Sequence, residues 1–161
     1  FSSPAVREEI LATACAVIRK YRYDVYKEEC AMGFGPSKDD ISFQFGRLLA
    51  VLEKVERDTY DNGETREPNA IRLQSIYCQR PLHTAGMLEK QLERAYFPRL
   101  AKPAFRAYYK NLIGEIMEKI YAKPKESWNA PLKETYLMGY YLQRKDLYTK
   151  KEKSEENKEE N

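Results

Sequence analysis

The chain has 161 residues, of which 42% are hydrophobic and 33% are charged, and these values predict one domain with a single core. Its formal net charge is +3, and because residues 150–161 hold four lysines and five glutamates, the part before them carries +4. This mildly basic balance excludes a histone-like polycation but allows contacts with phosphates.

The first two predicted helices are separated by a glycine- and proline-rich break at residues 33–36. The first begins at Pro4, which suits the first position of a helix, and its apolar residues recur at helical steps up to Val25. Asp40 is among the residues that can cap the second helix, which runs to about Thr59. The apolar stripe of this helix comprises Ile41, Phe45, Leu48, Leu52 and Val55.

The opposite face of the second helix is unusual, because two small residues, Gly46 and Ala50, lie one turn apart on it. Three basic residues flank them, namely Arg47, Lys54 and Arg57. Glycine costs about 1 kcal/mol relative to alanine in the middle of a helix, so we expect a close contact at Gly46 that offsets this cost. Nucleic acid, another protein or a packed helix of the same chain can each supply the contact. The basic residues fit a solvated face and a phosphate-binding face equally well.

Four further helical segments follow the polar turn cluster at residues 60–69. They are predicted at 71–80, 84–96, 103–121 and 132–150. Pro81, Pro98 and Pro124 mark the ends of the first three. No stretch shows the polar and apolar alternation of a strand, and the pattern therefore predicts an all-α fold.

The predicted architecture is a single bundle of five or six helices that forms one domain over residues 1–149. Residues 150–161 contain no apolar side chain, so we expect them to form a disordered charged tail.

Aromatic side chains are numerous, with thirteen tyrosines and six phenylalanines, and many stand beside lysine or arginine. Such mixed stretches occur at 19–23, 94–99 and 140–145. Cations that meet phosphates and rings that stack on bases suit single-stranded nucleic acid. The simpler interpretation is that most of these rings pack in the bundle and find hydroxyl partners at its edge. Arg144 lies on an apolar side of its helix, so it needs a structural partner.

The sequence offers little for catalysis or metal binding. His83 is the only histidine, and the three cysteines, Cys15, Cys30 and Cys78, form no Cys-x-x-Cys motif. Cys78 fits a small buried hydrophobe better than an activated thiol, and His83 fits the start of a helix better than a ligand position. We expect no enzymatic activity, no catalytic residue, no metal and no cofactor.

The sequence also bears on the cellular compartment, through the absence of membrane and secretion signals. No apolar run reaches the roughly 18 residues of a membrane helix, and residues 1–9 lack the pattern of a signal peptide. Unpaired cysteines fit a reducing environment. We expect a cytoplasmic protein with no membrane contact.

Three segments together resemble a known family. They are FQFGRLLAVLEK at 43–54, YYKNLIGEIME at 108–118 and LMGYYLQRKDLYTKK at 137–151. They resemble the C-terminal part of the large subunit of the type I-C CRISPR surveillance complex, Cascade, a part that is also translated separately as a small subunit. The family pattern usually carries an Arg-Asp-Arg-Tyr type of stretch after the second helix, whereas here only Arg72 and Tyr77 remain of it.

The resemblance implies a helical bundle in a prokaryotic cell that lies along the inner face of a crRNA-guided complex. Implied partners are the large subunit, the backbone subunits, further copies of the chain itself, the crRNA and the target DNA with its displaced strand. Base pairing with the guide supplies specificity in such complexes, so a subunit that holds the open R-loop needs basic, sequence-tolerant contacts and no catalytic groups.

We therefore predict a non-catalytic Cascade subunit that stabilises the R-loop. The predicted nucleic-acid contacts are Arg47, Lys54, Arg57, Arg72, Lys145 and Lys150. The alternative is a helical protein–protein adaptor that never contacts nucleic acid and docks another subunit on the face of Gly46 and Ala50. A third hypothesis, an enzyme that uses Cys78 or His83, has the least support.

Overall fold

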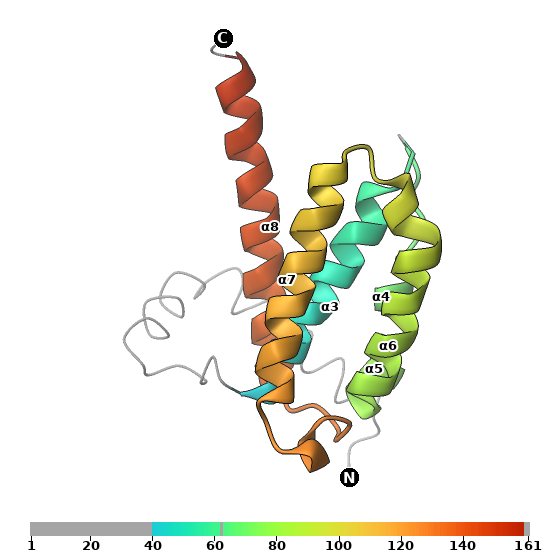
Figure 1. Cartoon of the computed structure of the whole chain (residues 1–161), viewed down its shortest axis with the longest axis vertical. Coiled ribbons are helices and arrows are strands. Elements are labelled where there is room, and N and C mark those ends of the chain that lie inside the picture. Colours follow the sequence, from blue (N-terminus) through green and yellow to red (C-terminus); the bar gives the residue numbers. More distant parts are fainter. Residues whose placement is uncertain (1–39, 62, 160–161) are drawn as a thin grey trace.

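The computed structural model describes residues 40–61 and 63–159. Its helices are α3 (Ile41–Asp58), α4 (Asn69–Arg72), α5 (Gln74–Gln79), α6 (Pro81–Gln91), a π-helical turn η1 (Leu92–Tyr96), a 3-10 turn η2 (Phe97–Arg99), α7 (Pro103–Tyr121), a 3-10 turn η3 (Lys125–Ser127) and α8 (Thr135–Glu159). These ranges contain six α-helices and no strand, which confirms the predicted all-α class (Figure 1). The helix expected from Pro4, the break at 33–36, Cys15 and Cys30 lie outside the described residues.

The helix boundaries agree with the predicted ones where proline sets them. α7 covers the expected range of 103–121, with Pro103 in its first turn. The segment expected at 71–80 is two short helices, α4 and α5, which meet at Leu73. Pro81 does not only end α5 but also begins α6, so α6 starts three residues earlier than expected. Helix α8 continues to Glu159, past the expected boundary between residues 149 and 150.

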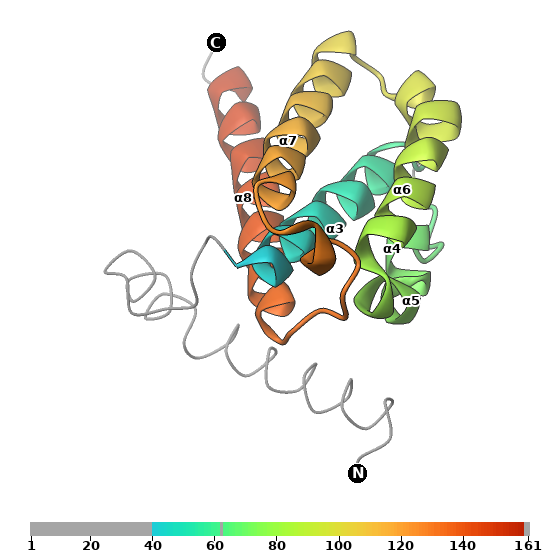
Figure 2. The same cartoon turned by 60° about the horizontal axis from the view of Figure 1, so that its bottom comes forward.

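Helix α3 is the central helix of the bundle. Fourteen of its eighteen residues are buried. Helices α7 and α8 pack against one side of it, and α4, α6 and η1 pack against the other (Figure 2). The apolar stripe of Phe45, Leu48, Leu52 and Val55 is buried as expected. The expectation of an accessible opposite face is wrong, because α8 covers that side of α3 and Ala50 is only 2% exposed.

Helices α3 and α8 touch through their backbones at two glycines. A Cβ atom added to Gly46 would lie 1.7 Å from the carbonyl oxygen of Tyr136, and one added to Gly139 would lie 2.0 Å from the carbonyl oxygen of Phe43. Ordinary side chains at these positions would hold the helices apart. The close contact expected at Gly46 therefore exists, and its partner is a helix of the same chain.

Tyrosines form a large part of the core. Five of them are buried in its main cluster, namely Tyr77, Tyr96, Tyr109, Tyr136 and Tyr140. The hydroxyl of Tyr77 donates to the carbonyl oxygen of Phe45 at 2.6 Å, and that of Tyr136 accepts from the Gln74 amide at 3.1 Å. The prediction that most rings pack in the bundle with bonded hydroxyls is confirmed for these positions. Throughout the described ranges, every helix lacks the length or the apolar character needed to span a membrane.

Candidate nucleic-acid interface

Arg47 lies half-buried where α3 crosses α8. Its Nε donates to Gln143 Oε1 of α8 at 2.9 Å, and its Nη1 donates to Gln44 Oε1 at 2.9 Å. Burial lowers the pKa of the Arg47 guanidinium, against the opposing effect of Glu115 and Asp146, which favour the charged form. An arginine remains protonated at neutral pH in spite of such a decrease. Its hydrogen bond to Gln143 joins α3 to α8 inside the bundle, and the bond to Gln44 lies within α3.

Lys54 is buried, with only 4% of its surface exposed. Its ammonium forms an ion pair with Asp58, one turn further along α3. The same nitrogen lies 5.0 Å from the ring centroid of Tyr148 in α8, where a cation–π interaction is favourable. The charge of Lys54 is therefore neutralised within the protein.

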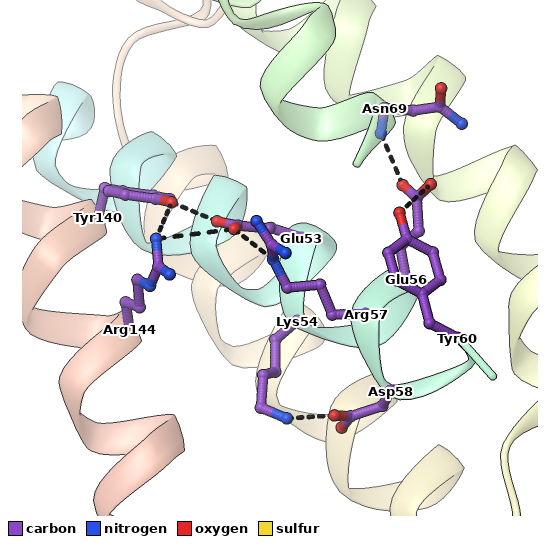
Figure 3. Close-up of polar contacts among 9 residues, drawn as sticks. All are labelled: Glu53, Lys54, Glu56, Arg57, Asp58, Tyr60, Asn69, Tyr140 and Arg144. Carbon is purple, nitrogen blue, oxygen red and sulfur yellow. Dashed lines mark hydrogen bonds and ion pairs between the residues drawn. The ribbon is translucent and has the colours of Figure 1, made fainter. Parts of the chain in front are cut away.

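Arg57 is the most accessible of the three predicted residues on α3, with 37% of its side chain exposed. Its Nε donates to Glu53 Oε1 at 2.8 Å (Figure 3). Glu53 also accepts the hydroxyl of Tyr140 and lies 3.7 Å from Nη1 of Arg144, both on α8. The expectation that Arg144 has a structural partner is confirmed.

Three buried or nearly buried carboxylates on α3 organise this region. Glu53 binds α8 through Tyr140, and Asp58 accepts the hydroxyl of Tyr109 in α7. Glu56 accepts three hydrogen bonds, from the hydroxyl of Tyr60 at 3.1 Å, the hydroxyl of Tyr96 at 3.0 Å and the backbone N–H of Asn69 at 2.8 Å. Figure 3 shows the groups around Glu53 and Glu56 on separate sides of α3. Each carboxylate thus ties α3 to a different neighbour.

Sequence reasoning missed these carboxylates because it considered only the basic residues of this face, as either solvated or bound to phosphates. A signal was present, since buried tyrosine hydroxyls need acceptors and the sequence has many tyrosines at helical steps. Helical spacing alone does not show which acid meets which tyrosine. Glu53 and Tyr140 are 87 residues apart in the chain.

The free energy of unfolding is expected to fall as the pH rises above about 10. Burial raises the pKa of Tyr109 and Tyr140 well above the ordinary value, and the neighbouring Asp58 and Glu53 raise it further. The unfolded chain therefore loses these protons first and is favoured at high pH. Urea unfolding between about pH 8 and about pH 11 measures the slope. Tyr109→Phe should flatten it, and an unchanged slope in that variant would contradict the assignment.

The other three predicted residues lie away from this network. Arg72 is the last residue of α4 and is exposed, and Lys145 is exposed on α8. Lys150 belongs to the later part of α8. Because α4 and α8 flank α3 from different sides, the structure does not bring the six predicted residues into one surface (Figure 2).

Among the residues whose exposure the structure describes, a dense run of exposed cations lies instead around the start of α7. All five of its members are exposed, namely Arg94, Arg99, Lys102, Arg106 and Lys110. Residues 94–110 contain no acidic residue. The mixed stretch at 94–99 already indicated part of this run. The absence of acidic residues up to Lys110 is the sequence signal that could have predicted the rest.

The positions of His83 and Cys78 agree with structural roles. His83 lies exposed in the first turn of α6, where its backbone N–H donates to Asn129 Oδ1 at 3.2 Å. Cys78 is partly buried against the core. In the part of the chain that the structure describes, no group of three or more His, Cys, Asp or Glu side chains is placed to hold a metal ion.

Comparison with models of known protein families gives a match. The model of a family described as CRISPR-associated protein (Cas_Csd1) matches residues 4–148. No curated protein and no solved structure matches the chain significantly. The match includes nearly all of the three segments whose residues indicated the resemblance, and it confirms that resemblance.

Proposed function

The chain belongs to the CRISPR-associated protein (Cas_Csd1) family, and on this basis we propose that it is a non-catalytic subunit of a type I-C Cascade that stabilises the R-loop. The family match over residues 4–148 is the observation that carries the proposal. Sequence-independent contacts to the displaced DNA strand or to the guide RNA are the proposed means. The exchange of a DNA duplex for an RNA–DNA duplex is nearly balanced in free energy, so a few such contacts are enough to shift it.

The helical scaffold supports this role. Internal hydrogen bonds and an ion pair fix α3 against its neighbours, so the outer helices have a firm support. We propose that Arg57, Arg72, Lys145 and Lys150 contact phosphates. Arg47 and Lys54 are bonded inside the bundle, and we propose that they contribute by positioning α3 and α8. The proposed protein partners are the large subunit, the backbone subunits and further copies of the chain.

The adaptor alternative needs a different surface from the one first considered. The face of Gly46 and Ala50 is covered by α8, so it cannot dock another subunit without opening the bundle. Salt separates this alternative from nucleic-acid binding. Binding through several phosphates falls steeply with rising salt, whereas docking through neutral surfaces changes little.

The test is reconstitution of the complex with and without this chain, followed by measurement of R-loop formation over a range of salt. Charge reversal at Arg72, Lys145 and Lys150 together is expected to reduce R-loop formation by about tenfold at moderate salt. Reversal at Lys119, Lys125 and Lys133, three exposed lysines, is the matched control and should have little effect. Equal R-loop formation without the chain at every salt concentration would refute the proposal.

A further inference from the structure

The surface around the start of α7 carries more basic than acidic side chains. It consists of the exposed cations Arg94, Arg99, Lys102, Arg106 and Lys110, here called the basic ridge. Glu93 forms ion pairs with Arg106 at 3.6 Å and with Lys110 at 2.9 Å. Within the described part of the chain, Arg94, Arg99 and Lys102 form no ion pair. Three of the five charges are therefore left for an external anion.

Two large rings lie exposed beside the basic ridge. Phe105 is 46% exposed and Tyr108 is 39% exposed, one turn apart on α7. The ammonium of Lys102 lies 5.7 Å from the ring centroid of Phe105. A single exposed apolar side chain is ordinary, but two rings one turn apart on the same helix form a patch that can serve a contact. Here they are accessible and flanked by cations.

The fold explains why these groups meet. η1 and η2 turn the chain at one end of the bundle, and Pro103 starts α7 directly afterwards (Figure 1). Arg99 is held to the end of α3, since its Nη2 donates to the carbonyl oxygen of Thr59 at 3.3 Å. Phe97 is buried beneath the ridge, with the guanidinium of Arg106 5.9 Å and the ammonium of Lys110 5.4 Å from its ring centroid. The cations are thus displayed from a rigid base.

We infer that the basic ridge, together with the rings of Phe105 and Tyr108, binds single-stranded nucleic acid. Excess cations select a polyanion, and accessible rings select one whose bases are unstacked, which a duplex does not offer. Stacking on a ring face tolerates any base, so no sequence preference follows. The inference rests on the proposed function for its natural ligand, the unpaired strand of an R-loop. It differs in the residues, because none of the ridge residues is among the six predicted contacts.

The role of the charges is tested by measuring how tightly the full chain binds a fluorescent oligothymidylate of about 20 nucleotides. Fluorescence anisotropy gives the affinity at salt concentrations from about 50 to about 300 mM. The triple variant Arg94→Gln, Arg99→Gln and Lys102→Gln is expected to bind at least tenfold more weakly. Its slope of log affinity against log salt should be smaller by about 2, since each phosphate contact to a single strand contributes about 0.7. The control replaces Lys119, Lys125 and Lys133 by glutamine near the opposite end of α7 and should leave affinity and slope unchanged (Figure 1).

The ring contacts have a separate readout. Phe105→Leu is expected to weaken binding at least fivefold without changing the salt slope, whereas Phe105→Tyr keeps a ring and should keep the affinity. A duplex of the same length should bind more weakly than the single strand. The inference is overturned if the triple variant and Phe105→Leu both bind the oligonucleotide as tightly as the unchanged chain. That result would favour an acidic protein as the partner of this surface. The inference is overturned equally if the control variant loses as much affinity.

Failure of this inference is distinguishable from failure of the proposed function. If the reconstituted complex needs the chain for R-loop formation but the triple variant binds the oligonucleotide normally, the ridge inference is wrong and the proposed function stands. If the triple variant loses oligonucleotide binding but the complex forms R-loops equally well without the chain, the ridge is a binding surface and the proposed function is wrong.

Discussion

Replacing Gly46 with alanine is expected to lower the free energy of unfolding by about 3 kcal/mol, at the upper end of the usual cost of overpacking. The added Cβ would lie 1.7 Å from the carbonyl oxygen of Tyr136, so backbone would meet backbone. No flexible side chain can move aside to accept it, and α3 and α8 would have to separate. Gly139→Ala should act similarly, because its Cβ would lie 2.0 Å from the carbonyl oxygen of Phe43.

The chain offers matched controls for this experiment. Gly86 in α6 and Gly114 in α7 have nothing within 4 Å of an added Cβ. Alanine at either position is expected to stabilise the protein by about 0.5 to 1 kcal/mol, since it has the better helix propensity. Equilibrium unfolding in urea compares the four variants. If all four changed stability in the same direction by similar amounts, the close crossing of α3 and α8 would be disproved.

Replacing Glu53 with alanine is expected to lower the free energy of unfolding by about 3 kcal/mol, because it removes the shared partner of Tyr140, Arg57 and Arg144. The carboxylate is 3% exposed, whereas the side chains of Arg57 and Arg144 are 37% and 35% exposed. Water can therefore reach the two cations after the substitution, which places the effect at the lower end of the range for broken buried pairs.

Two further variants make this test specific. Glu118→Ala removes an exposed carboxylate from α7 and should change stability by less than about 0.5 kcal/mol. Tyr140→Phe removes only the hydroxyl that Glu53 accepts. In a double-mutant cycle, the losses from Glu53→Ala and Tyr140→Phe should add to more than the loss in the double variant. Strict additivity would show that the two groups do not interact.

Folding and the proposed nucleic-acid binding depend on different charges in this protein. The charged groups of α3 serve the bundle, since Arg47, Lys54, Glu53 and Glu56 are all bonded to other side chains or backbone groups. The cations left for an external partner lie on the outer helices and turns. Apart from Arg57, which also bonds Glu53, the proposed contacts with nucleic acid therefore lie outside this network, which allows variants at those positions to remain folded.

The prediction from sequence succeeded where the signal is local. Helix α7 was predicted with its observed ends, because Pro103 suits a first turn and the apolar positions from Tyr109 to Ile120 recur at helical steps. The need of Arg144 for a partner was also predicted, since an unpaired charge among apolar neighbours is costly. Both arguments use residues close together in the chain.

The prediction failed on the second face of α3. A helical wheel shows Arg47, Lys54 and Glu53 as a polar side, and a polar side normally faces water. It cannot show that α8 lies across this side and supplies Gln143, Tyr140 and Tyr148 as partners. Gly46 was the one local indication of a close contact, and it did not identify the partner.

By itself the sequence determined the helical class, the ends of α7 and the family resemblance, because periodicity, proline positions and ordered motifs are properties of neighbouring residues. Only the tertiary structure decided which charged side chains face water. That outcome depends on contacts such as Glu53 with Tyr140, 87 residues apart, where burial and pairing are set by the crossing of two helices. The charge of a side chain follows from the residue type, whereas its exposure to water depends on the tertiary structure.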